Sequence, residues 1–446
     1  MKRALYALTL VAICAFLAAC SAENGSTEEV VLSEIYQQPL AEFVATLPRE
    51  QNQSIAHGAN DFAFRLSAEM LAGQDGGNFI MSPFSVWLPL AALANVTNEE
   101  ILGQLVQVLV GNCGDESLPS VEDINNAASQ MLYYLTGEHV RVWGVNFPNP
   151  LHIANAIFLN QNMAFNPVFV NDFAKYFLGS AMNVDFAHPS AAEDVNRWAK
   201  DNTEGHIDNI VNSGDFDEDT VMAIVNAIYF SARWSREFDS TMTQMGTFYG
   251  TNAQTQKMLM EMSWGGNAPL EGYVRYYEDD FVQSLNLAFN TGGVLQILLP
   301  KNGDATDLLA NMTAEYFAYI NHNKIQATGR LVMPRFEIEN DHNNLLDALE
   351  GIGVPLMNPS AHPLNAILDP EGNPIFLSDA MQMATISVDE EGTTAAAVTV
   401  MIGMLLSGPR IQGHFEMVAN RPFVFILHKP SIGGVNQILF MGIVNQ

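Results

Sequence analysis

Side chains that could do catalytic chemistry are scattered along this chain and form no known catalytic pattern. The sequence contains no Gly-x-Ser-x-Gly nucleophile elbow, no His-Glu-x-x-His zinc pair, no Cys-x-x-Cys and no phosphate-binding glycine loop. Its histidines, among them His139, His152, His188 and His206, have no carboxylate at a spacing that supports general-base catalysis. The sequence therefore predicts a protein that is not an enzyme.

One acidic run resembles the start of a calcium-binding loop. Residues 215–219 read Asp-Phe-Asp-Glu-Asp. An EF-hand loop that began at Asp215 would need glycine at its sixth position and glutamate at its twelfth, but Thr220 and Asn226 stand there. We therefore interpret the run as a solvated turn before a strand, and we expect neither a metal nor a cofactor.

The segment from Gly392 to Pro409 is difficult to explain as part of a resting fold. It reads Gly-Thr-Thr-Ala-Ala-Ala-Val-Thr-Val-Met-Ile-Gly-Met-Leu-Leu-Ser-Gly-Pro and has no charged residue, although three acidic residues, 389–391, come directly before it. Its threonines and valines disfavour a helix and favour an extended strand. By residue type alone, an internal strand of a resting sheet is as good an interpretation as an exposed, insertable loop.

Because alternate residues of a strand face the same side, this segment would have only small side chains on one face: Thr393, Ala395, Ala397 and Thr399. A strand with such a face can slide between two existing strands without a clash. Gly392 gives the backbone freedom to turn toward a sheet. At the far end, residues 405–409 read Leu-Leu-Ser-Gly-Pro, and an apolar side chain beside Ser-Gly-Pro makes a good extended protease substrate.

Charge and cysteine content exclude several classes of function. The chain has 19 basic and 49 acidic residues and a net charge of −30, which argues against nucleic-acid binding and against a heparin-type site. Of its three cysteines, Cys14 and Cys20 fall in the N-terminal segment, and Cys113 lies in a sequence typical of a loop. If Cys14 is removed and Cys20 is lipidated, no intrachain disulfide can form, so packing must stabilise the fold.

The N-terminus is typical of an exported lipoprotein. A basic start at Lys2 and Arg3 is followed by an apolar run that ends in Leu17-Ala18-Ala19-Cys20, which looks like a bacterial lipobox. We expect residues 1–19 to be a signal peptide and residues 20–57 a tether lipidated at Cys20. The alternative is an ordinary signal peptide in which Cys20 is incidental. With Ser21 after the cysteine, the expected address is the cell envelope, at the outer membrane if the cell has one.

Hydrophobic periodicity predicts helices first and then mostly strands. Asp61–Leu71 has helical spacing after a possible cap at Asn60, and residues 221–230 form the apolar run expected of a strand buried on both faces. No linker interrupts the chain after residue 60, so a single α+β domain over residues 58–446 is expected. The other expected helices are 84–94, 99–109, 165–177 and 191–202. The other expected strands are 78–82, 153–159, 294–300, 331–338 with a break at Pro334, 423–427 and 438–444.

In order along the chain, these segments resemble the serpin family. The resemblance runs from about Asn60 to the C-terminus and implies one α+β domain with three β-sheets, about nine helices and an exposed reactive-centre loop. The motifs that carry it are residues 60–66, 78–85, 154–159, 184–186, 196–198, 202–207, 225–230 with Trp234, 390–397, 420–423 and 439–442.

The resemblance also assigns roles to particular residues. The hinge of inhibitory members matches Glu390, Glu391, Gly392, Thr393, Thr394, Ala395, Ala396 and Ala397. The region where the main sheet opens matches Ser82, Ser85, Asn226, Trp234 and Gln382. The chain departs from the family pattern at three places. Gln382 stands where a histidine is common, and Thr394 stands where a glutamate often follows the hinge threonine. Residues 94–97 lack the usual small residues.

The implied activity is suicide inhibition of a protease. The target attacks the loop and forms an acyl-enzyme, and the cleaved loop, about 50 Å from Gly392 to Leu406 at ~3.3 Å per residue, then enters the main sheet. Counting from the hinge places the scissile bond between Leu406 and Ser407, or after Met404 or Leu405 if the register shifts. We expect a monomer that traps a chymotrypsin- or elastase-like serine protease, with a cysteine protease as another possible target. The rival function is a non-inhibitory serpin that binds, stores or chaperones.

Overall fold

The structure is a computed structural model, and its described residues fall within one compact unit. The predicted lipidation site Cys20, the loop cysteine Cys113, the hinge residues 394–397 and the scissile bond at residues 406–407 lie outside the described residues. The described ranges are 49–72, 76–111, 118–136, 140–142, 145–147, 151–164, 166–203, 205, 207, 209–212, 214–217, 220–265, 272–341, 345–361, 363–364, 375–393 and 411–446.

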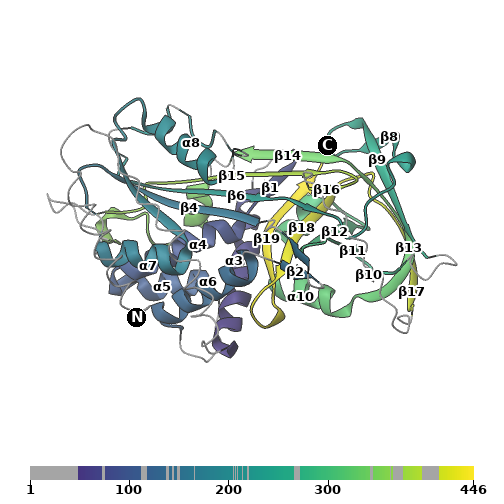
Figure 1. The fold of residues 1–446 in the computed structure, drawn as a ribbon, viewed down its shortest axis with the longest axis horizontal. Coiled ribbons are helices and arrows are strands. Elements are labelled where there is room, and N and C mark those ends of the chain that lie inside the picture. The colour runs from purple at the N-terminus through teal and green to yellow at the C-terminus, as the bar shows by residue number, and fades with distance from the viewer. Residues whose placement is uncertain are drawn as a thin grey trace. The chain divides into compact units, whose positions relative to one another are not determined.

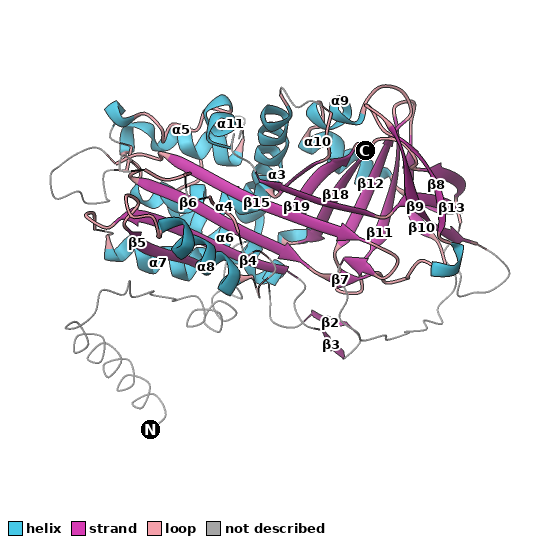
Figure 2. Ribbon diagram, turned by 90° about the horizontal axis from the view of Figure 1, so that it is seen from above, coloured by secondary structure: helices cyan, strands magenta, loops and turns pink. Residues whose placement is uncertain are grey.

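A five-stranded sheet forms one layer, and its strands lie side by side across the middle of Figure 2. All nine residues of β6 are buried, because an apolar strand in the centre of a sheet is covered on both faces. The strand order is β14 (Phe336–Asp341), β15 (Asp379–Val388), β6 (Met222–Phe230), β4 (Leu151–Asn160) and β5 (Gly179–Val184).

The remaining long strands form a ten-stranded ladder. It narrows to three residue pairs between β10 and β13. Its order is β1 (Phe79–Met81), β19 (Asn436–Val444), β18 (Phe423–Pro430), β12 (Val294–Pro300), β11 (Val282–Ala288), β10 (Val274–Glu278), β13 (Ile325–Pro334), β9 (Gln254–Trp264) and β8 (Gln244–Tyr249), with β17 (Gly413–Val418) on β13. Two short pairs complete the strands: β2 (Val140–Val142) with β3 (Val145–Phe147), and β7 (Ala232–Arg233) with β16 (Gly392–Thr393).

Helices cover the five-stranded sheet unequally. On one face α8 (Ala191–Asn202) packs Val195 and Trp198 against Ala223, Val225 and Ala227 of β6, and Figure 1 shows it on the opposite side of the sheet from α3 to α7. The other face borders the main core. The described residues hold nine α-helices, and the other eight are α3 (Arg49–Leu71), α4 (Pro83–Leu93), α5 (Glu99–Val110), α6 (Val121–Thr136), α7 (Pro167–Phe177), α9 (Ala305–Ala310), α10 (Ala314–Asn323) and α11 (Leu345–Gly351). Single 3₁₀ turns occupy Ala94–Val96, Ser240–Met242, Pro359–Ala361 and Ile432–Gly434.

The expected start of the first helix was wrong. Helix α3 begins at Arg49, inside the segment expected to be a tether, so Asn60 lies in its interior and is not a cap. The Asn60 amide is buried against β19, where Nδ2 donates to the carbonyl of Asn436 (2.9 Å) and Oδ1 accepts from the N–H of Ile438 (3.1 Å). A polar side chain that satisfies another element fits a helix interior at little cost. None of the helices in the described residues has the length and apolar content of a membrane span.

Candidate functional site: the mouth of the five-stranded sheet

The two central strands of the five-stranded sheet pair directly and in parallel. Their register runs from Asp379 opposite Ala223 to Ala384 opposite Ile228. β15 continues to Val388, and its last four residues still pair with β14 on the other side. Because the β15–β6 pairing stops before the strands end, the described part of the sheet has an open mouth at this end.

A tight turn follows β15 at the mouth. The Asp389 carboxylate accepts hydrogen bonds from the N–H groups of Glu391 (2.8 Å) and Gly392 (3.0 Å), and the Asp389 N–H donates to the carbonyl of Gly392 (3.0 Å). Gly392 has a φ of +151°, and a Cβ there would lie 2.2 Å from the carbonyl oxygen of Ala232. The turn therefore requires glycine at residue 392.

Thr393 is already seated beside the continuation of β6. It pairs in antiparallel register with Ala232 of β7, and only 1% of it is exposed. Its Oγ1 accepts from the Ala232 N–H (3.0 Å) and donates to the Ala232 carbonyl (3.3 Å). The first small residue of the expected hinge thus occupies the entrance of the mouth with its hydroxyl fully satisfied.

Trp234 ties the chain after β7 to the hinge turn. Its backbone N–H donates to the Glu391 carbonyl and its indole Nε1 donates to the Asp389 carbonyl, both at 2.9 Å. The indole is buried and stacks on Phe289 at a centroid distance of 4.3 Å. Trp234 therefore holds two carbonyls of the turn that lies at the open end of the sheet.

Glu390 anchors the turn by charge. Its carboxylate accepts from Arg335 (2.6 Å) and from the Thr243 hydroxyl (2.5 Å). Burial acts to raise the pKa of Glu390, but these hydrogen bonds and the charge of Arg335 act to lower it, and the pKa lies below its usual value. Glu391 also pairs, through a more exposed contact, with Arg233 (2.9 Å).

Lower in the sheet, Gln382 joins β15 to the start of α4. Its Oε1 accepts from the Ser82 N–H (2.9 Å), and its Nε2 donates to the Ser82 carbonyl (2.7 Å) and the Ser85 Oγ (2.8 Å). The Ser85 hydroxyl also donates to the Ser82 carbonyl (2.9 Å). The structure thus brings together three residues that the family resemblance assigns to sheet opening, and it holds them with an amide that does not titrate.

Asn226 of β6 lies opposite Gln382 of β15 on one side and opposite Asn155 of β4 on the other. Its Nδ2 donates to the Asn155 Oδ1, and both side chains are buried. Within the described residues, the buried Asn226 Oδ1 and Ser82 Oγ have no hydrogen-bond partner. An unpaired buried acceptor is uncommon and costs roughly 1–3 kcal/mol.

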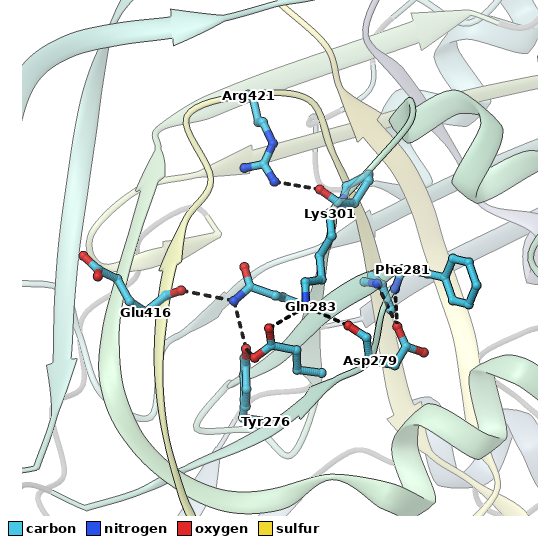
Figure 3. Close-up of polar contacts among 10 residues, drawn as sticks. Tyr276, Asp279, Phe281, Gln283, Lys301, Glu416 and Arg421 are labelled. Atoms are coloured by element: carbon cyan, nitrogen blue, oxygen red, sulfur yellow. Dashed lines mark hydrogen bonds and ion pairs between the residues drawn. The ribbon is translucent and has the colours of Figure 1, made fainter.

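The segment beyond the expected loop is fixed to the ladder by polar contacts, which Figure 3 shows. Gln283 Nε2 donates to the Glu416 carbonyl of β17 (3.1 Å) and to the Tyr276 hydroxyl (2.9 Å). Arg421 donates to the Pro300 carbonyl (2.7 Å), so the chain that follows β17 is also held. The chain that follows the expected loop therefore continues into β17, which these contacts and its pairing with β13 hold in place.

Burial and neighbouring groups shift the pKa values of two side chains among these contacts, Tyr276 and Glu278. Burial and a hydrogen bond to Glu278 (2.6 Å) raise the pKa of Tyr276, so its hydroxyl stays protonated. Lys301 donates to the Glu278 carboxylate (2.8 Å) and the Asp279 carbonyl (2.9 Å), and it lowers the pKa of Glu278.

Several partners at the mouth were missed by sequence reasoning. Arg335, Thr243 and Ala232 were not singled out, since each meets its partner only through tertiary structure. In the described part of the chain no group of three or more His, Cys, Asp or Glu side chains is placed to hold a metal, and Asp217 of the acidic run accepts a hydrogen bond from the Thr220 hydroxyl (3.1 Å).

Comparison with known proteins defines the class of this fold and site. The profile of the family described as "Serpin (serine protease inhibitor)" matches residues 57–446. Serpin-Z7 of Hordeum vulgare is similar at 27% identity over 412 residues, which cover 89% of this chain and 97% of that relative. The chain therefore belongs to the serpin family, as the order of its motifs predicts.

Solved structures agree on the fold. Serpin48 of the insect Tenebrio molitor aligns with a TM-score of 0.72 at 24% identity, covering 90% of this chain and 100% of that one. Human thyroxine-binding globulin complexed with thyroxine aligns with a TM-score of 0.73 at 21% identity, covering 89% of this chain and 99% of that one. The expected α+β serpin fold with three sheets is confirmed. Serpins are generally protease inhibitors and not enzymes, and the inhibitors act on target proteases.

Proposed function

We propose that this chain inhibits a serine protease as a suicide substrate. The observation that carries the proposal is the direct parallel pair of β15 and β6, with a turn and a seated Thr393 at its open end. A chain that leaves β15 and turns back runs antiparallel to β15. Because β6 is parallel to β15, the same chain runs antiparallel to β6 as well. One inserted strand therefore replaces a single parallel ladder with two antiparallel ladders, which are slightly more stable per residue.

The register of Thr393 defines how such a strand would enter. Extending it two residues at a time pairs Ala395 with Phe230, Ala397 with Ile228 and Thr399 with Asn226. Phe230 and Ile228 belong to the main core, and directly opposite residues share a face of a sheet. The small side chains therefore enter the packed side of the sheet, where larger ones would clash.

This register also gives the unpaired acceptor on β6 a role. Insertion brings the Thr399 hydroxyl beside Asn226, whose Oδ1 is buried and lacks a partner within the described residues. A hydrogen bond from Thr399 to that oxygen would remove the cost of the unpaired acceptor. The closed sheet thus contains a buried acceptor without a hydrogen bond, which insertion would satisfy, and this difference favours the inserted state.

The loop supplies the peptide bond that the target protease attacks. The target's nucleophile attacks the bond between Leu406 and Ser407, or the one after Met404 or Leu405, and forms an acyl-enzyme. The freed hinge enters the sheet and carries the attached protease with it, which distorts the protease's catalytic site. An apolar residue before the scissile bond suits a chymotrypsin- or elastase-like enzyme. We further propose that a lipid on Cys20 tethers this inhibitor to the bacterial cell envelope.

A gel assay with chymotrypsin tests the proposal. An SDS-resistant adduct of inhibitor and protease is expected, with the chain cut in the loop. Clean cleavage without an adduct would support the rival, a non-inhibitory serpin. The observation behind that rival is the similarity of this fold to the structure of thyroxine-binding globulin with thyroxine.

A further inference from the structure

A pocket of about 290 Å³ opens beside the mouth, at the ends of β9, β10 and β11 and the chain after β7. Figure 2 shows β7 close to the end of β11, and Trp234 and Phe289 form an isolated bridge there. Small organic ligands occupy pockets of roughly 300–1,000 Å³, so this volume lies at the lower limit and suits only a small ligand. The lining residues that matter below are Trp234, Arg236, Trp264, Tyr273, Arg275 and Asn286.

The charge of the pocket is opposite to that of the chain. Acidic residues outnumber basic ones 49 to 19 in the sequence. The described lining nevertheless contains Arg236 and Arg275 and no Asp or Glu. Arg275 donates to the backbone carbonyl of Asn321 (3.2 Å), and among the described residues it forms no ion pair with a carboxylate. The pocket is therefore a local positive site on an acidic protein, and it attracts anions.

The walls are aromatic. Trp234 and Trp264 are 3% and 8% exposed, and Tyr273 is 40% exposed at the rim. The Arg236 guanidinium lies 5.8 Å from the centre of the Trp264 ring, in a cation–π arrangement. Flat rings beside a guanidinium favour a planar apolar body, because stacking and apolar burial act together.

We propose that this pocket binds a small planar aromatic carboxylate. The guanidinium of Arg236 or Arg275 holds the carboxylate through paired N–H donors, a geometry that suits arginine. The ring lies among Trp234, Trp264 and the apolar floor formed by Met262 and Leu287. The Asn286 amide, the Ser235 hydroxyl and the Tyr273 hydroxyl add polar contacts at the edge.

The site has a direct link to the hinge. Trp234 forms one wall and also donates to the Asp389 and Glu391 carbonyls of the hinge turn. A ligand that packs on Trp234 in its present position stabilises that position by mass action. Amide hydrogen exchange in the peptide containing residues 389–393 should therefore slow when the pocket is filled.

Isothermal calorimetry with naphthoate and its neutral amide, naphthamide, tests the site on the purified chain. Naphthoate should bind at least about tenfold more tightly, because a charge-assisted pair contributes roughly 1.5–3 kcal/mol. The double variant Arg236→Ala/Arg275→Ala should lose that preference. Arg197→Ala, at an arginine outside the pocket whose side chain is 63% exposed, should keep it.

Two results would overturn the proposal. One is equal affinity of the wild-type chain for naphthoate and naphthamide, a comparison that needs no variant and so does not depend on folding of the double variant. The other is an unchanged naphthoate preference in the double variant. Each readout is a binding constant, so the outcome is independent of whether the chain inhibits a protease.

Discussion

The hydroxyl of Thr393 bonds both the N–H and the carbonyl of Ala232, and the two residues face each other in antiparallel register. A strand that inserts between β15 and β6 would begin with this pair. The hinge of the closed molecule therefore already lies in the register that insertion extends, and the following predictions test what depends on it.

Thr393→Arg should convert the inhibitor into a substrate. The side chain is 1% exposed, so arginine would place an unpaired charge in the entrance of the mouth, at a cost of several kcal/mol. A penalty of roughly 3 kcal/mol on insertion slows it about a hundredfold against deacylation. SDS gels should show cleaved chain in place of adduct. Thr393→Ser, which keeps the hydroxyl, is the control and should still form the adduct. A stable adduct with the arginine variant would contradict the assignment of the hinge.

Gln382→Leu should destabilise the closed state. The substitution removes three hydrogen bonds and leaves the buried Ser82 N–H without its partner, which costs roughly 1–3 kcal/mol. Thermal unfolding should show a lower midpoint. Gln256→Leu, at an exposed glutamine, should change the midpoint little. If both variants melt alike, Gln382 does not hold β15 to α4.

Acidification should loosen the hinge turn through Glu390. The folded pKa of Glu390 is lowered, so its stabilising contribution is full above the unfolded value of about 4.5 and disappears as pH falls through the lower folded pKa. The protection factors of residues 389–393, which correct hydrogen exchange for its slower intrinsic rate in acid, should fall in that acidic range. In Glu390→Gln the exchange should be faster at neutral pH and lack the acidic step. A variant that keeps the step would assign it to another carboxylate.

Leu406→Arg should redirect inhibition from chymotrypsin-like to trypsin-like enzymes. The residue before the scissile bond fills the protease's specificity pocket, and a charged side chain there suits an acidic pocket. Rates of adduct formation with trypsin and chymotrypsin measure the change. Met404→Arg is the matched control and should leave selectivity unchanged. If Met404→Arg alone redirects the inhibitor, the register of the loop is shifted.

Local sequence patterns predicted the parts of this fold that local physics determines. The buried strand β6 followed from its apolar run. The Pro334 break between β13 and β14 followed from proline's missing N–H.

Contacts across long sequence separations could not be predicted in the same way. Glu390 meets Arg335 across 55 residues and Gln382 meets Ser82 across 300 residues, and no spacing in the sequence indicates either pair. Asn60 looked like a cap because the partner that buries it, β19, lies at the other end of the chain. Its role became visible only when the two segments packed together.

The central claim is that the closed sheet lies above its energy minimum and that a cut loop can fill it. Calorimetric unfolding of the intact chain and of the same chain nicked by protease beside Leu406 tests this most directly. Two new antiparallel ladders and a satisfied Asn226 should raise the melting temperature of the nicked chain by about 10 °C or more, which for a domain of this size corresponds to several kcal/mol. Equal melting temperatures before and after cleavage would contradict the claim.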